Sequence, residues 1–437
     1  MNNLTVTTQS IEHLLAYSAN ARTHSKSQIK KIAESITEFG FTSPVLVDKK
    51  STVIAGHGRL EAAKLLDIKK VPTICLDDLT SEQVRAYRIA DNRLAELAEW
   101  DSALLSIEFQ QLDALELDFD LSVTGFDTPE IDLLIGGDDE GRLEEDDDVH
   151  PPADGPSTTR IGDLWRIGEH RLICGDATDR RTYERLLDGA TAQMVFTDPP
   201  YNVPVDGHVS GKGKHKHREF AMASGEMSET AFTTFLTNVF FHLAAASDDG
   251  AVHFICMDWR HMAEVLAAGR DAYTDLKNLC VWAKTNGGMG SLYRSQHELI
   301  FVFKSGDGPH INNVELGRYG RNRTNIWTYP GANSFGKTRD ADLALHPTVK
   351  PVSLVADAIL DCSNRKGVIL DAFAGSGTTL LAAHQTGRRG YGVELDPLYC
   401  DVILRRLQTA AGTDAVNMET GETFAECAAA RAEADNG

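Results

Sequence analysis

The sequence predicts a doubly wound α/β protein preceded by a smaller α+β unit. Three observations carry this prediction. Apolar strand-like segments alternate with helical segments from Ile161 onward. Two of these strands run directly into polar or glycine-rich turns, at the place where open α/β sheets bind ligands. An acidic, proline-rich stretch separates this region from residues 1–115, whose pattern is different.

Length and composition fit two globular units connected by a linker. The chain has 437 residues, of which 42% are hydrophobic and 24% charged. Its seven cysteines form no C-x-x-C pair, which suits a reducing cytoplasm and gives no zinc-site spacing. The first ten residues lack the features of a signal peptide, and no apolar run approaches the roughly 20 residues that span a bilayer. We therefore expect a cytoplasmic protein without a metal or a membrane partner.

The net charge of −21 is unevenly distributed. Residues 138–148 hold eight acids and one base, a density that favours a solvated linker. Residues 318–339 hold five bases and no acid. Because steering depends on the local field, the overall acidity does not exclude a nucleic-acid partner.

The first unit, residues 1–115, has the pattern of a small α+β fold. Ser25 and Gln28 form a capping box at the start of a helix, which Gly40 ends. Short apolar segments follow around a polar turn, and Gly56 opens another helix. We expect, in order, a helix at 26–39, strands at 44–47 and 52–54, a helix after Gly56, a strand at 71–76 and a helix at 81–97.

Residues 116–158 have the composition of a linker, with a weak acidic helix at 129–135 and a proline-rich stretch at 151–156. The second unit then covers 159–410, and residues 411–437 form a C-terminal tail. Its clear strands are expected at 194–197, 252–257, 279–283, 299–303, 368–373 and 390–394.

The first strand-end motif is Asp198-Pro199-Pro200-Tyr201. The prolines cannot continue a sheet and make the turn stiff. The Asp198 carboxylate and the Pro199 carbonyl are two acceptors close together, with Tyr201 as a flat platform. This set suits an amino group on a planar base, although a polar turn with a surface tyrosine is the simpler alternative.

The second motif is a buried strand followed by Phe373-Ala374-Gly375-Ser376-Gly377-Thr378 and an apolar helix. Glycines at a helix start let the backbone approach a nucleoside or phosphate. The next strand ends in Glu394, at the spacing where a carboxylate binds ribose hydroxyls. An ordinary βαβ unit with a surface glutamate is the alternative.

Together these motifs resemble those of amino-group DNA methyltransferases. Asp198 to Tyr201 resembles the catalytic motif, and Phe373 to Gly377 the S-adenosylmethionine motif. The catalytic motif comes first, which resembles the circularly permuted β class, and 346–351 is similar to a segment that contacts the cofactor in that class. The resemblance covers about residues 159 to 410 and implies a Rossmann-like sheet.

The resemblance also implies a set of site residues. The target base would be held by Asp198, Pro199, Pro200 and Tyr201. Within the cofactor site, Glu394 would bind the ribose, Asp176 would lie near adenine, and Thr348 and Lys350 would flank the methionine end. The full cofactor set is Asp176, Phe373, Ala374, Gly375, Ser376, Gly377, Thr378, Glu394, Thr348 and Lys350.

The implied reaction is direct methyl transfer to N6 of adenine in DNA after base flipping. Members acting on N4 of cytosine more often have serine at the position of Asp198, so adenine is favoured and N4 of cytosine stays open. A second alternative is a DNA-binding or nucleotide-switch protein whose methyltransferase unit is not catalytic. No nuclease motif is visible, so a restriction partner would be a separate protein. Nothing in the sequence excludes a homodimer.

We expect DNA recognition in residues 286–345. Basic residues there, and in a basic histidine-containing loop at 208–218, suit phosphate contacts. The candidates are Arg318, Arg321, Arg323, Lys337, Arg339, Lys214 and Lys216. Residues 331–338 also match a P-loop pattern, which we reject because no apolar strand precedes it.

The stretch from Pro44 to Ala63 resembles the N-terminal domain of ParB-like proteins. His57 and Arg59 lie at a helix start that would favour an anion, a nucleotide or DNA phosphate. Leu60 replaces a second arginine that is usual in partition proteins, which argues against nucleotide hydrolysis. The alternative is that His57 and Arg59 make only internal hydrogen bonds.

Overall fold

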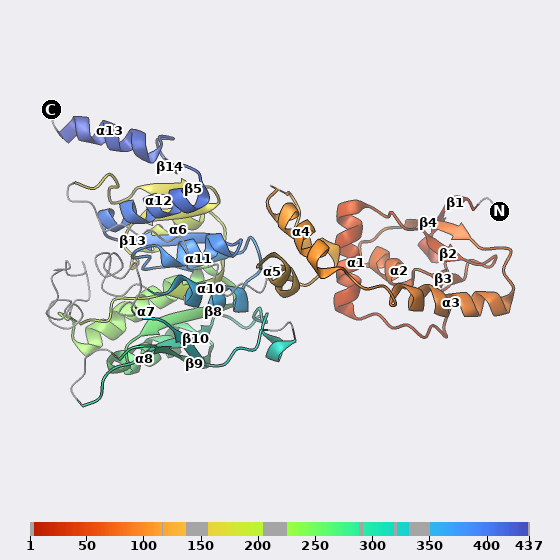
Figure 1. The fold of residues 1–437 in the computed structure, drawn as a ribbon, viewed down its shortest axis with the longest axis horizontal. Coiled ribbons are helices and arrows are strands. Elements are labelled where there is room, and N and C mark those ends of the chain that lie inside the picture. The colour runs from red at the N-terminus through yellow and green to blue at the C-terminus, as the bar shows by residue number, and fades with distance from the viewer. Residues whose placement is uncertain are drawn as a thin grey trace. The chain divides into compact units, whose positions relative to one another are not determined.

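The computed structural model describes residues 4–115, 117–136, 156–203, 225–287, 292–318, 321–331 and 350–435. The chain divides into two compact units, Met1–Asp138 and Asp139–Gly437 (Figure 1). The predicted acidic run at 138–148 lies outside the described residues, as does most of the proline-rich stretch.

The first unit contains a four-stranded sheet in the order β1-β4-β2-β3. Buried residues of β2, β3 and α2, including Val45, Val53 and Leu60, form its core. The predicted α+β fold is confirmed. Its elements are β1 (Val6–Ser10), α1 (Lys26–Phe39), β2 (Val45–Val47), β3 (Val53–Ala55), α2 (His57–Leu65), β4 (Lys70–Cys75) and α3 (Ser81–Ala95).

The first helix has half of the predicted capping box at its start, because the Gln28 side chain bonds His24 at 3.0 Å, and the predicted glycine at its end. The Ser25 hydroxyl accepts a hydrogen bond from the Gln28 amide at 3.1 Å, which satisfies one of the free donors of the first turn. Gly40 ends α1 with a φ of +78°, a conformation that favours glycine. The predicted bounds 26–39 are those observed.

Helices continue into the segment expected to be a linker. α4 (Ser102–Asp113), a short 3₁₀ turn (Leu121–Thr124) and α5 (Thr128–Gly136) pack around the buried Phe109, Leu121 and Ile131. The predicted linker, 116–158, contains the expected helix at 129–135 within α5, and its apolar residues Leu121 and Ile131 pack with Phe109 of α4. They give residues 117–136 a small core shared with α4.

The second unit is built on a sheet in the order β11-β9-β10-β8-β7-β12-β13-β6-β5-β14. Five central strands, β8, β7, β12, β13 and β6, run parallel. The strands are β5 (Leu164–Ile167), β6 (His170–Cys174), β7 (Ala192–Thr197), β8 (Ser247–Met257), β9 (Asp275–Lys284), β10 (His297–Lys304), β11 (Ile326–Tyr329), β12 (Val368–Asp371), β13 (Arg389–Glu394) and β14 (Ala415–Asn417). The helices are α6 (Arg180–Leu187), α7 (Glu229–Ala245), α8 (Met262–Ala272), α10 (Val352–Cys362), α11 (Thr378–Gln385), α12 (Pro397–Ala411) and α13 (Phe424–Asp435).

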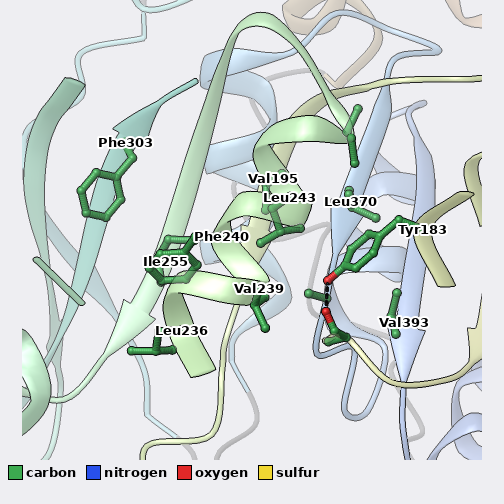
Figure 2. Close-up of a cluster of buried hydrophobic side chains, with 14 of the residues drawn as sticks. Tyr183, Val195, Leu236, Val239, Phe240, Leu243, Ile255, Phe303, Leu370 and Val393 are labelled. Carbon is green, nitrogen blue, oxygen red and sulfur yellow. Dashed lines mark hydrogen bonds between the residues drawn. The ribbon is translucent and has the colours of Figure 1, made fainter. Parts of the chain in front are cut away.

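Helices cover both faces of this sheet. Side chains of α6, α7 and α8 pack on one face, where Phe240, Ile255 and Leu370 lie in one cluster (Figure 2). Side chains of α10, α11 and α12 pack on the other face. Successive side chains of a strand point to opposite faces of the sheet. Leu370 therefore lies in the first cluster and its neighbour Ile369 in the second. The predicted doubly wound α/β fold is confirmed.

The C-terminal residues are part of this unit. β14 pairs with β5, and Phe424 packs edge-on against Trp165 with ring centroids 5.6 Å apart. Within the predicted C-terminal tail, 411–437, the buried Ala415, Phe424 and Cys427 lie in one cluster with residues of α12.

The order of strands fixes where a ligand can bind. From β7 the chain moves toward β8, and from β12 it moves toward β13 on the other side. β7 and β12 are neighbours, so their carboxyl ends form the switch point of the sheet. Both predicted motifs begin there. Among the described residues, no helix is long and apolar enough to cross a bilayer.

Phe240 and Phe241 are neighbours on α7 that test this packing. Phe240 is 0% exposed and Phe241 is 49% exposed. We predict that Phe240→Ala lowers the free energy of unfolding by about 3–5 kcal/mol, because it leaves a cavity in the core. Phe241→Ala should change it by roughly 0.5 kcal/mol or less. Urea unfolding of both variants checks this, and equal costs would contradict the assigned face of α7.

Candidate active site

A buried carboxylate joins the two motifs. Thr197, the last residue of β7, donates a hydrogen bond to Asp371 Oδ1 at 2.8 Å. Asp371 ends β12 and also accepts from the Thr379 hydroxyl at 2.6 Å and the Phe373 amide at 3.0 Å. Burial raises the pKa of Asp371 to about 6, although these hydrogen bonds oppose the change. One side chain thus fixes the end of β7, the glycine turn and the start of α11.

Asp198 follows Thr197 and lies in a compact group of charged side chains. Its Oδ2 is 2.5 Å from Lys350 Nζ, and its Oδ1 accepts from the Tyr201 hydroxyl at 2.7 Å. Lys350 Nζ is also 3.0 Å from Glu298 Oε2. Lys284 forms an ion pair with Glu298 Oε1. The ends of β7, β9 and β10 and the segment before α10 therefore supply one network.

Burial governs the electrostatics of this network. It raises the pKa of Asp198, and the Lys350 ammonium opposes that rise. Burial would also raise the pKa of Glu298, but Lys350 and Lys284 together hold it at about 2. The pKa of Tyr201 is raised by burial and by both carboxylates, so its phenol is neutral.

This arrangement adds two residues to the predicted site. Lys350, which the resemblance places beside the methionine end of the cofactor, contacts Asp198 and Glu298 through its ammonium. Glu298 and Lys284 were not predicted as site residues. Lys284 ends β9 and Glu298 lies at the start of β10, and only their partners in space identify them as site residues.

The glycine turn of the second motif has the predicted geometry. The Gly375 amide donates to Glu394 Oε2 at 2.8 Å, and Gly377 caps α11 with a φ of +85°. Ser376 and Thr378 are buried, and the Ser376 carbonyl accepts from Arg406 at 2.8 Å. Burial raises the pKa of Glu394 to about 7.

A third strand end meets this turn. The Gly175 amide, after β6, donates to the Glu394 carbonyl at 2.9 Å, which brings Asp176 to the same edge of the sheet. The Asp176 carboxylate accepts from the Thr178 amide at 2.7 Å. Glu394, Asp176 and the half-buried Phe373 are all partly exposed. Two accessible carboxylates and an aromatic ring around a glycine turn fit a nucleoside, so the residues present fit the implied cofactor.

The predicted DNA-contacting arginines differ in their surroundings. Arg321 is 2.8 Å from Asp361, and Arg323 is 2.9 Å from Asp357, both acids lying on α10. These guanidiniums are largely buried and anchor the strand β11 region to α10, which argues against their expected role in binding phosphate. Arg318 is exposed and pairs with Glu315 at 2.8 Å. Outside the described residues lie Lys214, Lys216, Lys337, Arg339 and Thr348.

The two residues predicted to bind an anion in the first unit are only partly free. Arg59 donates to the Ser43 carbonyl at 2.9 Å, and burial lowers its pKa. His57 Nε2 is buried and has no hydrogen-bond partner. Burial, with help from Arg88, lowers the pKa of His57, so its ring is neutral. Arg59 thus follows the internal alternative, while His57 keeps an unused ring nitrogen.

A search of the described side chains finds no cluster of three or more His, Cys, Asp or Glu that could hold a metal ion. The histidines at 208, 215 and 217 lie outside this part of the chain.

The fold and the site define a Rossmann-like methyltransferase unit preceded by a ParB-like unit, and family profiles agree. A DNA methylase profile for N6 and N4 methylation matches residues 192–405. A ParB N-terminal domain profile matches residues 2–93, and a ParB-methyltransferase HTH domain profile matches 103–161. The chain belongs to the N6/N4 DNA methylase family and carries both ParB-related domains.

Individual proteins resemble different parts of the chain. The ParB-like nuclease domain-containing protein YnaK of Escherichia coli is 51% identical over 73 residues, which are 17% of this chain and 84% of YnaK. The type II methyltransferase M.HpaI of Haemophilus parainfluenzae is 24% identical over 257 residues, 55% of this chain and 75% of that protein. The crystal structure of the M1.HpyAVI–SAM complex has a TM-score of 0.41 at 18% identity, covering 54% of this chain and 98% of that one.

The ion pairs of α10 give a stability prediction. Asp361 is 8% exposed, and removing it leaves Arg321 and Arg323 without one counter-charge. We predict that Asp361→Ala costs about 3–5 kcal/mol of unfolding free energy. The matched control is Glu315→Ala, which breaks the ion pair between Glu315 and Arg318. Their side chains are 40% and 63% exposed, so this change should cost about 1 kcal/mol or less. Urea unfolding of each variant decides, and a small cost for Asp361→Ala would restore the two arginines as candidates for DNA contact.

Proposed function

We propose that this DNA methyltransferase transfers a methyl group from S-adenosylmethionine to N6 of adenine, with Asp198 and Pro199 holding the amino group. The observation that carries the proposal is the link from Thr197 to Asp371. It sets the acceptor groups of the first motif directly beside the glycine turn of the second. A base amine and a nucleoside cofactor bound at these two strand ends would be neighbours.

The chain's own residues suit the cofactor. Glu394 presents a carboxylate for the ribose hydroxyls, Asp176 lies at the adenine end, and Phe373, Gly375 and Ser376 line the turn. Bound S-adenosylmethionine supplies an electrophilic methyl group that departs from sulfur, leaving the bonding electrons on sulfur.

The amino group is a poor nucleophile because its lone pair is delocalised into the ring. Hydrogen bonds from its two N–H groups to the Asp198 carboxylate and the Pro199 carbonyl favour the sp³-like geometry that localises this lone pair. The N–C bond then forms as the C–S bond breaks, and the amine proton passes to Asp198. Positioning and preorganised charge supply the catalysis, without a covalent enzyme intermediate.

Adenine is favoured over cytosine by the identity of residue 198. Cytosine N4 is the same kind of amino acceptor, and the mechanism would serve it unchanged. The resemblance associates aspartate at this position with adenine and serine with cytosine. Either base would have to be flipped from the duplex to reach Asp198, which is half-buried.

The groups that bind the DNA backbone belong to the same proposal. The HTH-type segment, 103–161, is a poor candidate, because it contains 17 acids and only three basic residues, Arg142, His150 and Arg160. Arg318 and the basic residues 214, 216, 337 and 339 remain the candidates. An anion at His57, a homodimer and a cytoplasmic location are further proposals.

The product of the reaction tests the proposal. We predict that protein incubated with labelled S-adenosylmethionine and mixed genomic DNA produces labelled N6-methyladenine. Asp198→Ala should lose at least about 100-fold in rate, because an acceptor used in the transition state is gone, and should keep cofactor affinity. Asp188→Ala, at the exposed residue that ends α6, serves as the matched control. Label in N4-methylcytosine would overturn the base, and unchanged turnover by Asp198→Ala would overturn the role of Asp198.

Cofactor affinity should depend on pH through Glu394. Its pKa is raised to about 7, and protonation removes acceptor capacity from the carboxylate that would bind the ribose. We predict that S-adenosylmethionine binds more weakly as the pH falls from 8 to 6. Glu394→Gln should bind about 10–100-fold more weakly at pH 8 and show no such dependence. Calorimetric titrations at each pH measure this, and a pH dependence retained by the variant would exclude Glu394 as its source.

A further inference from the structure

Lys350 occupies an unusual position for a charged side chain. Only 5% of it is exposed, and its ammonium lies between two carboxylates, 2.5 Å from Asp198 Oδ2 and 3.0 Å from Glu298 Oε2. It also lies 3.2 Å from the Tyr201 hydroxyl. An ammonium without partners would be very costly at this depth, so both carboxylates are needed to hold it there.

Glu298 connects this ammonium to a second one. Its other oxygen, Oε1, pairs with Lys284, the last residue of β9, whose side chain is 26% exposed. The network therefore contains two carboxylates and two ammoniums and is neutral as a whole. The Tyr201 hydroxyl lies between the carboxylates, 2.7 Å from Asp198 Oδ1 and 3.1 Å from Glu298 Oε2, and its single proton can bond to one of them at a time.

Two other groups near Asp198 do not stabilise its ionised form. Cys256 of β8 is buried, and burial raises the pKa of its thiol, which is therefore neutral. Asp371 of β12 is a further acid, and its charge disfavours ionisation of Asp198. Within the described part of the chain, Lys350 is the cation that contacts Asp198 directly.

We infer that Lys350 keeps Asp198 in its ionised, amine-accepting form, and that Glu298 is a positioning residue that limits how strongly Lys350 does so. The inference rests on the proposed function of Asp198. Lys350 supplies the charge that makes the carboxylate an acceptor in a buried site. Glu298 shares the ammonium, so Asp198 stays basic enough to receive the proton of the methylated amine.

The balance of the step shows why both roles are required. When the amine nitrogen bonds to the methyl carbon, the C–S bond electrons remain on sulfur and the nitrogen becomes positively charged. Its proton then moves to the Asp198 carboxylate, which releases it to solvent before the next turnover. Too little positive charge beside Asp198 leaves it already protonated, and too much makes it a weak proton acceptor.

Two substitutions test the inference, because they should shift the pKa of Asp198 in opposite directions. In Lys350→Met, the acidic limb of the single-turnover pH profile should shift upward by at least about one pH unit. In Glu298→Gln, it should shift downward, with a lower plateau rate at high pH. A merely structural role for these residues would lower rates without opposite shifts. Lys350→Arg, which keeps the charge, should leave the limb in place, and Lys277→Met at an exposed position on β9 is the control.

Infrared difference spectra separate this inference from the proposed function. The spectrum of the protein minus that of Asp198→Asn should show an ionised carboxylate at pH 7. The same difference taken in the Lys350→Met background should show a protonated carboxylic acid. These spectra with no methyl transfer by the unmodified protein would overturn the proposed function alone. An ionised Asp198 in the Lys350→Met background, or limbs that do not move, would overturn the inference.

Discussion

The hydrogen bond between Thr197 and Asp371 is the constraint on which the site depends. It joins the last residue of β7 to the last residue of β12, at the point where the chain leaves the sheet in opposite directions. Asp371 extends the constraint to the glycine turn and α11 through Phe373 and Thr379. An amine-binding loop and a nucleoside-binding turn are thereby held in one fixed relation, which a reaction governed by positioning requires.

Charge is arranged around this frame so that each buried group has a partner. The ammonium of Lys350 and the carboxylates of Asp198 and Glu298 neutralise one another with Lys284 at the rim. A second network lies beside it. There Asp357 and Asp361 of α10 neutralise Arg321 and Arg323, which precede β11. The first network surrounds a reactive centre and the second fixes a strand beside it. The first network differs in that Asp198 directly follows β7 at the switch point of the sheet, beside the glycine turn.

The sequence predicted the fold well because strands, caps and glycine turns are local signals. The helix at 26–39, the central strands and the position of Glu394 relative to Gly375 all followed from spacing. The cluster around Lys350 did not, since its members come from residues far apart in sequence that meet only through strand order. The ion pairs of Arg321 and Arg323 could not be predicted for the same reason, because their acidic partners lie on α10 and a basic run alone does not show them.

The most direct test of the account is a crystal structure with S-adenosylhomocysteine and a DNA duplex. The account predicts a flipped base whose amino nitrogen lies about 3 Å from both the Asp198 carboxylate and the Pro199 carbonyl. Lys350 should still contact Asp198, and the nucleoside should lie against Glu394 and the turn at Gly375. A base whose amino group lies away from Asp198, or a cofactor bound elsewhere, would contradict it.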